Sequence, residues 1–223
     1  PPPCAGAIMA STLIRRLFFL TTAAAGWVNR VAAADQDDTD QPSLPPPAAA
    51  TLLFDGKDLS AWVAEKGGGP PAWKVENGYL ETTAGSGGIL TREHYRDFQL
   101  HVEFRIPDPV GPSRGNSGIY LQGKYEVQIM DSYGRPPELG GCGALYREVP
   151  PLRNMSKRPG RWQTFDIAFR APRYDEAGGE LKQKGLLTVF HNQVMVHNNL
   201  EIPGMTGQAK RNPKNDPRQP GPI

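Results

Sequence analysis

Residues 116–132 read NSGIYLQGKYEVQIMDS, and this stretch decides the fold. Apolar and polar residues alternate on both sides of residues 123–124, which is typical of two half-buried strands joined by a turn. The odd-numbered residues of 125–129 are apolar and should face a core, whereas Glu126 and Gln128 should lie on the other face. The pattern predicts a β-hairpin with a carboxylate and an amide on its polar face.

The rest of the chain from residue 51 repeats this pattern. Short strand-like runs are separated by Gly, Pro, Asn and Asp, and no long amphipathic helix is evident. Residues 72–82 (AWKVENGYLET) contain the Asn-Gly dipeptide of a tight hairpin. Regularly spaced short strands predict an all-β sandwich. Residues 133–160 form a long loop, which we expect to cover a site.

A second long strand is predicted over residues 99–106 (QLHVEFRI). Its apolar residues point one way, and Glu103 and Arg105 point the other way. If this strand neighbours residues 125–129, Glu103 and Arg105 should share one sheet face with Glu126.

Charge and cysteine content exclude some classes of protein. The 223 residues include 25 Lys and Arg against 23 Asp and Glu, a net charge of +2 that gives no sign of nucleic-acid binding. The 25 Gly and 23 Pro indicate a folded domain rich in turns. Cys4 and Cys142 are the two cysteines, too few for a disulfide framework.

The first fifty residues resemble an export signal followed by a flexible linker. Residues 9–34 have a basic, an apolar and a small-residue region in the order of a signal peptide, and Arg15-Arg16 resembles a twin-arginine motif. The apolar run is too short for a membrane span. We therefore expect residues 1–34 to be a signal with upstream residues, 35–50 a flexible linker and 51–223 the domain of a periplasmic or extracellular protein. The fold should survive removal of the first fifty residues.

Seven motifs in order then resemble the 3-keto-disaccharide hydrolase family. They are LFDGKDLSAW, WKVENGYLE, GGILTREHYRDFQLHVEFRI, NSGIYLQGKYEVQIMDS, GALYREVPP, PGRWQTFDIAFRAP and VFHNQVMVHNN. The resemblance implies a concanavalin A-like lectin/glucanase jelly-roll sandwich of two antiparallel sheets, export, and a 3-keto-glycoside or 3-keto-disaccharide as substrate. Because family members continue beyond the last motif seen here, it also implies that a C-terminal strand is missing.

Such a substrate is cleaved by removal of the C2 proton, elimination of the glycosidic oxygen and hydration. This chemistry needs a base, an acid and donors to the enediolate oxygen. The candidate catalytic residues are Glu126, Asp131 and His197. The candidate substrate-binding residues are Glu103, Arg105, Asn116, Gln122, Gln128 and Tyr146.

Each candidate also has a structural interpretation. Glu126 would be a solvated strand residue, Asp131 a turn cap and His197 a packed histidine. Glu103 and Arg105 would form a cross-strand ion pair. No cofactor is assigned. Whether the site binds a divalent metal ion is left open, because Glu103, Glu126, Asp131 and a histidine would supply mainly oxygen ligands.

Two other functions compete with this one. A non-catalytic carbohydrate-binding module uses the same fold, but exposed aromatic residues rather than carboxylates would dominate its face. An ordinary retaining or inverting glycosidase needs two opposed carboxylates. Gln128 stands where enzymes of that kind on this fold carry an acid, which favours the 3-keto-glycoside hydrolase.

Overall fold

The structure is a computed structural model, and it describes residues 12–20, 38–83, 85–175, 177, 179–212 and 214–223. Its elements are β-strands and one 3-10 helix, η1 (Gly207–Arg211). No helix in this described part is long and apolar enough to span a membrane.

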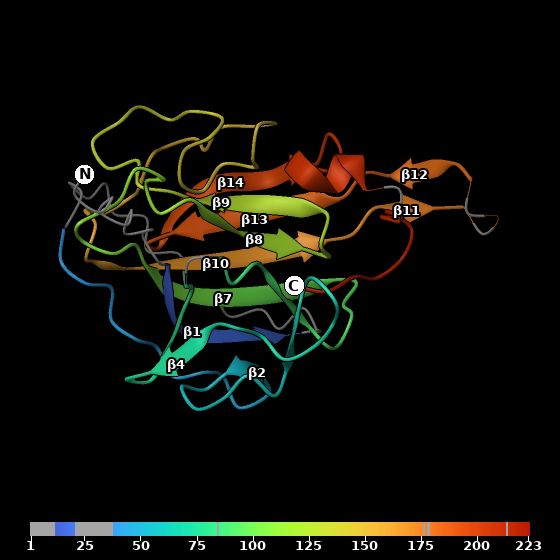
Figure 1. The fold of residues 1–223 in the computed structure, drawn as a ribbon. Helices are drawn as coiled ribbons and strands as arrows, with labels where there is room; N and C mark the ends of the chain where they lie inside the picture. The colour runs from blue at the N-terminus through green and yellow to red at the C-terminus, as the bar shows by residue number, and fades with distance from the viewer. Residues whose placement is uncertain (1–11, 21–37, 84, 176, 178, 213) are drawn as a thin grey trace, which may run out of the picture.

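The largest sheet has eight antiparallel strands (Figure 1). In spatial order they are β14 (Val194–Glu201), β13 (Leu186–His191), β10 (Trp162–Arg170), β7 (Phe98–Arg105), β1 (Leu13–Leu20), β5 (Tyr79–Glu81) and β4 (Lys74–Glu76), and β2 (Thr51–Phe54) pairs with β1. Smaller sheets pair β8 (Ser117–Leu121) with β9 (Tyr125–Ile129), β3 (Trp62–Ala64) with β6 (Ile89–Thr91), and β11 (Arg173–Tyr174) with β12 (Leu181–Gln183).

The core lies between the eight-stranded sheet and the β8–β9 hairpin, which crosses in front of that sheet in Figure 1. Val102 and Phe104 of β7 belong to the same buried cluster as Val127 and Ile129 of β9. These are the residues that alternation assigns to the core. The predicted all-β sandwich of antiparallel sheets is therefore confirmed.

The predicted hairpins are also present. Asn77 and Gly78, at φ 51° and 79°, join β4 to β5. Residues 122–124 join β8 to β9, with Gln122 and Gly123 at φ 56° and 64°, so the connection begins one residue before the predicted turn at 123–124. Two successive residues with positive φ give the turn whose twist matches that of paired strands.

Strand β1 comes from the predicted export signal. It pairs with β7 along most of its length and also with β5 and β2. The side chains of Ile14 and Leu17 are buried in the core. The sheet thus contains a strand from outside the predicted domain. Residues 1–11 and 21–34 lie outside the described residues, and export and a missing C-terminal strand remain predictions.

Residues 38–50, expected to belong to a flexible linker, lie along the outer face of the large sheet. The Gln41 N–H donates to the carbonyl of Trp162 over 3.0 Å, and the Trp162 N–H donates to the Asp40 carboxylate over 2.9 Å. The acidic composition of this segment suggests a solvated tether, but an acidic side chain also accepts hydrogen bonds from a neighbouring strand. The segment is bound to the sheet through such contacts.

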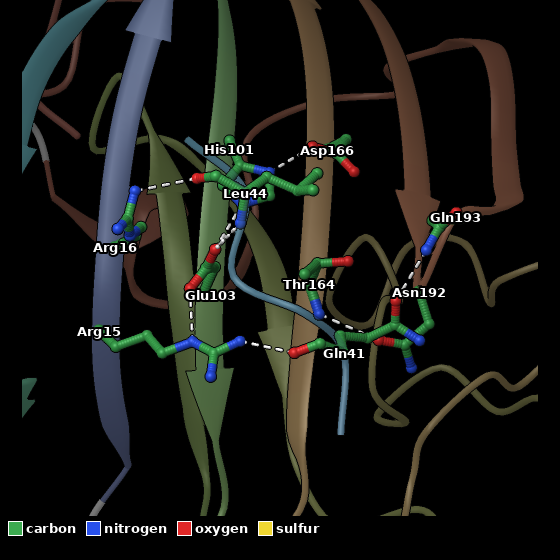
Figure 2. A network of polar contacts seen from close by, with 10 residues as sticks. All are labelled: Arg15, Arg16, Gln41, Leu44, His101, Glu103, Thr164, Asp166, Asn192 and Gln193. Atoms are coloured by element: carbon green, nitrogen blue, oxygen red, sulfur yellow. Dashed lines mark hydrogen bonds and ion pairs between the residues drawn. The ribbon is translucent and has the colours of Figure 1, made fainter. Parts of the chain in front are cut away.

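A buried network of charges joins β1, β7 and β10 to this segment (Figure 2). Arg15 donates to Glu103 over 2.5 Å, and the Leu44 N–H donates to the other Glu103 oxygen over 2.9 Å. His101 lies 2.5 Å from Asp166 through Nδ1 and 3.4 Å from Glu103 through Nε2. The side chains of His101 and Glu103 are fully buried. Each charge in the network therefore has an opposite charge beside it.

Neighbouring charges decide the protonation of this network. Burial alone would lower the pKa of His101, but hydrogen bonds to Asp166 and Glu103 outweigh it and raise the pKa to about 9. Burial would raise the pKa of Glu103, but hydrogen bonds from His101, the Leu44 N–H and Arg15 lower it. At neutral pH, His101 is therefore a buried cation between two carboxylates.

We expect the stabilising contribution of His101 to be lost as the pH rises from about 6.5 to about 9. Its folded pKa lies above the unfolded value, so its contribution is complete below pH 6.5 and is lost as the pH rises through about 9. Urea unfolding at several pH values should show this loss in the wild type and in His94→Gln, whose histidine is exposed. The free energy of unfolding of His101→Gln should fall less over the same pH range. Equal slopes in all three proteins would contradict the assignment.

In the full chain β1 packs into the core, and the expectation that the first fifty residues can be removed without cost stays a prediction. Leu17→Ala should lower the free energy of unfolding by about 2–5 kcal/mol, because Leu17 is 2% exposed in the core. Leu52→Ala on β2, where the side chain is 48% exposed, is the control and should change little. Wild-type stability of Leu17→Ala in denaturant would show that β1 does not belong to the folded core.

Candidate active site around Glu126

A cavity of about 810 Å³ lies beside β8. This volume is within the range of small-molecule sites. Its lining combines apolar side chains with convergent polar groups, the mixture that binds a ligand with several hydroxyls. The polar members include Glu65, Asn116, Tyr120, Gln122, Glu126 and Arg211, and the apolar members include Ile14, Leu17, Trp62, Trp73 and Leu80.

Glu126 brings a carboxylate to this cavity. It is the second residue of β9, directly opposite Tyr120 on β8, and the Tyr120 hydroxyl donates to Glu126 Oε2 over 2.7 Å. The Glu126 N–H donates to the Thr206 hydroxyl over 2.7 Å. Only 7% of Glu126 is exposed. Glu126 is therefore not a solvated strand residue.

The surroundings of Glu126 change its acidity. Burial raises the pKa of its carboxyl group above the usual 4.5, while the Tyr120 hydroxyl and the charge of Arg147 oppose this shift. Burial, and then the adjacent Glu126, raise the pKa of Tyr120, so its phenol stays protonated at neutral pH. A carboxyl pKa moved toward neutrality suits a group that exchanges protons with a substrate.

Three amide side chains lie around the cavity. Asn116 and Gln122 line it, and Gln128 Nε2 donates to Asn116 Oδ1 over 3.3 Å. Gln122 Nε2 donates to the carbonyls of Tyr95 and Arg96. The Oε1 atoms of Gln122 and Gln128 are buried with no hydrogen-bond partner among the described residues. Because such acceptors are costly when unpaired, a buried water would pair with them favourably.

The predicted long loop does approach the site. Its Tyr146 N–H donates to the carbonyl of Glu126 over 2.9 Å. A β-carbon built on Gly207 would lie 3.2 Å from Glu126 Oε2 and 3.3 Å from the Tyr146 ring, so these groups meet at that glycine. Tyr146 therefore lies beside Glu126, although it does not line the cavity.

Glu103 and Arg105 do not share a face with Glu126, and that expectation is wrong. β7 belongs to the large sheet and β9 to the hairpin, and their apolar residues pack on each other across the core. Their polar residues must then point in opposite directions. Glu103 is held in the network of Figure 2, and the Arg105 guanidinium lies 5.0 Å from the centre of the Trp162 ring. Neither residue can bind a substrate beside Glu126.

Asp131 and His197 also lie outside the cavity lining. The Asp131 carboxylate accepts the Tyr133 N–H over 3.2 Å, as a turn-capping aspartate does. His197 Nε2 lies 2.8 Å from the Gly143 carbonyl, and burial lowers the pKa of His197. Both contacts fit the structural interpretation of these residues.

The side chains considered for a divalent ion are not brought together. Glu103 lies on the opposite side of the sandwich from Glu126, and Asp131 and His197 contact other parts of the chain. Over the described ranges, no group of three or more His, Cys, Asp or Glu side chains is placed to hold a metal ion. The residues named from the sequence therefore do not form a metal site with one another.

Sequence reasoning did not single out Tyr120 or Glu65. The turn expected at residues 123–124 would have placed position 121 opposite position 126, whereas the observed connection of residues 122–124 places Tyr120 there. Glu65 follows β3, and its N–H donates to the Gly88 carbonyl over 2.9 Å. It reaches the cavity from another sheet, so no short-range pattern connects it with Glu126.

Comparison with known families supports a carbohydrate-active site. The model of the 3-keto-alpha-glucoside-1,2-lyase-like domain matches residues 49–223. No curated protein matches the chain.

Two similar solved structures come from Parabacteroides distasonis ATCC 8503, and both proteins are provisionally classed as glycosyl hydrolases. The first is 34% identical with a TM-score of 0.69, and the match covers 84% of this chain and 86% of that chain. The second is 23% identical with a TM-score of 0.50, covers 66% and 69%, and shows the fold alone. The predicted jelly-roll sandwich is thus confirmed.

Proposed function

Because the chain belongs to the family of 3-keto-alpha-glucoside-1,2-lyase-like domains, we propose that it cleaves 3-keto-glycosides, including 3-keto-disaccharides. At a coarser level, the family and the first structural neighbour support a carbohydrate-active enzyme of the hydrolase type. The observation that carries the finer proposal is the buried carboxylate of Glu126, with its raised pKa, at a cavity with polar walls.

The keto group at C3 determines the chemistry. It acidifies the hydrogen on C2, so a base can take that proton and leave an enediolate across C2 and C3. The electrons then form a C1–C2 double bond as the bond from C1 to the glycosidic oxygen breaks. The leaving oxygen takes a proton and departs as an alcohol, and water adds across the double bond to complete the hydrolysis.

The cavity contains a group for each requirement. Glu126 acts as the base toward C2. Arg211 is a cation in the lining and stabilises the negative enediolate oxygen. Glu65, a second acidic side chain in the lining, serves as the general acid whose carboxyl proton passes to the leaving oxygen, in place of the Asp131 expected from the sequence. Asn116 and Gln122 bind sugar hydroxyls, and Gln128 holds Asn116 in place.

The competing functions differ in what they would do with a substrate. A binding module would bind a 3-keto-disaccharide without cleaving it. An ordinary glycosidase that used Glu65 and Glu126 as its two carboxylates would cleave the same disaccharide without the C3 ketone. Our proposal requires that the protein cleave the disaccharide that carries the C3 ketone and leave intact the disaccharide that lacks it.

We also propose that the protein is exported, as the signal-like residues 9–34 suggest. Mass spectrometry of the protein from the cell envelope or medium should then find an N-terminus near Asp35. Such a protein would lack β1, and its sheet would have to close between β5 and β7 in another way. Protein that is recovered only from the cytoplasm, with residues 13–20 intact, would contradict export.

Glu126→Gln should lower the turnover of 3-keto-trehalose or 3-keto-lactose by about a hundredfold or more, the usual effect of losing a positioned base. KM and the melting temperature should change little, because glutamine keeps the size and the hydrogen bond to Tyr120. Release of free 3-keto-glucose is the measurement. Glu138→Gln in the exposed loop is the matched control. Gln128→Ala should mainly raise KM. A turnover rate of Glu126→Gln close to that of the wild type would show that Glu126 is not the base.

A further inference from the structure

We propose that Tyr120 and Gly118 form a positioning device that leaves Glu126 Oε1 free to act as the base. This inference rests on the proposed function, because it assigns how the carboxylate of that site is held. It adds two residues that neither the sequence nor the family match points to. The device lies within the β8–β9 hairpin and the start of η1, where Gly207 lies.

Gly118 is present for space rather than for backbone conformation. It lies in β8, and it is not among the glycines with positive φ, so its backbone would accept any L-residue. A β-carbon built on it would lie 2.5 Å from Glu126 Oε1 and 2.8 Å from Cγ. Real β-carbons do not approach other atoms so closely. Glycine in a strand interior weakens the strand, and it often marks the close approach of another group. Here that group is the carboxylate.

The other carboxylate oxygen is held on its own side. Tyr120 donates to Oε2 over 2.7 Å, and a β-carbon on Gly207 would lie 3.2 Å from the same oxygen. The carboxylate therefore lies in a slot between two glycines, with the tyrosine fixing its rotation. A hydrogen bond to an ionised carboxylate is strong and directional. Tyr120 thus engages Oε2 and leaves Oε1 as the proton acceptor.

The hydrogen bond from Tyr120 also favours the ionised form of the base against the effect of burial. To act as the base, the Glu126 carboxyl group must be deprotonated when the substrate arrives, although it is buried. Burial favours the neutral acid, whereas the hydrogen bond from Tyr120 favours the carboxylate. Removal of the tyrosine hydroxyl should therefore move the ionisation of Glu126 to higher pH. A residue that only packed against its neighbours would not have this effect.

The first test is Tyr120→Phe, which keeps the ring and removes the hydroxyl. We expect kcat for a 3-keto-disaccharide to fall about tenfold or more. The acidic limb of the pH profile of kcat/KM, where activity rises as Glu126 loses its proton, should move to higher pH. Tyr79→Phe is the control, because Tyr79 is outside the cavity lining. An unchanged kcat and pH profile in Tyr120→Phe would overturn the proposal.

The second test is Gly118→Ala, with Gly69→Ala as the matched control. Neither glycine has positive φ, and a β-carbon at Gly69 would meet nothing within 4 Å. Gly118→Ala should lower kcat more than it raises KM, because it displaces the carboxylate. Wild-type kcat in Gly118→Ala would overturn the assigned role of that glycine. If this variant fails to fold, the Tyr120→Phe profile still decides the proposal.

A readout without substrate separates this inference from the proposed function. NMR titration of ¹³C-labelled glutamate carboxyl groups, with Glu126→Gln to assign the signal, reports the pKa of Glu126 directly. A higher pKa in Tyr120→Phe than in the wild type supports the device even if no 3-keto-glycoside is cleaved. An inactive Glu126→Gln combined with the same Glu126 pKa in Tyr120→Phe and wild type would overturn the inference and leave the proposed function standing.

Discussion

The apolar core between β7 and β9 is the constraint on which the rest of the structure depends. Both strands turn their apolar residues toward it, so their polar residues must face outward on opposite sides of the sandwich. One outer face holds Glu103 and His101 beneath the N-terminal segment. The other side holds Glu126 beside a cavity. The core thereby divides carboxylates that look equivalent in the sequence into two separate environments.

The two environments differ in how completely their polar groups are paired. Around Glu103, each charge has an opposite charge or an N–H beside it, which is what a structural network requires. Around Glu126, two buried amide oxygens lack partners among the described residues, and one tyrosine holds the carboxylate. Proteins retain such incomplete polar groups where a ligand or a reaction repays their cost. Unpaired buried atoms also occur away from the site, among them Arg105 Nε and Gln163 Nε2, so the cavity and the carboxylate together, rather than pairing alone, mark the site.

Alternation predicted the hairpins and the core residues well, because period-two patterns are local. It assigns faces within one strand and says nothing about which sheet that strand joins, so it wrongly grouped Glu103 and Arg105 with Glu126. His191 directly precedes a turn, a position where side chains are usually exposed. Asn192 and Gln193 make that turn, and His191 remains buried in β13. Several contacts of residues 38–50 are to partners more than a hundred positions away, which composition does not show.

The Tyr120–Glu126 pair has a further consequence because it is local. The two residues are six positions apart and face each other across one tight turn, so a single hairpin encodes their geometry. The walls of the cavity, in contrast, come from residues as distant as Ile14 and Ile223. The hairpin region thus carries the reacting group together with Asn116 and Gln122, whereas the remaining walls are inherited on other parts of the chain. Selection can reshape the walls for a new glycoside while the hairpin passes unchanged from one enzyme to the next.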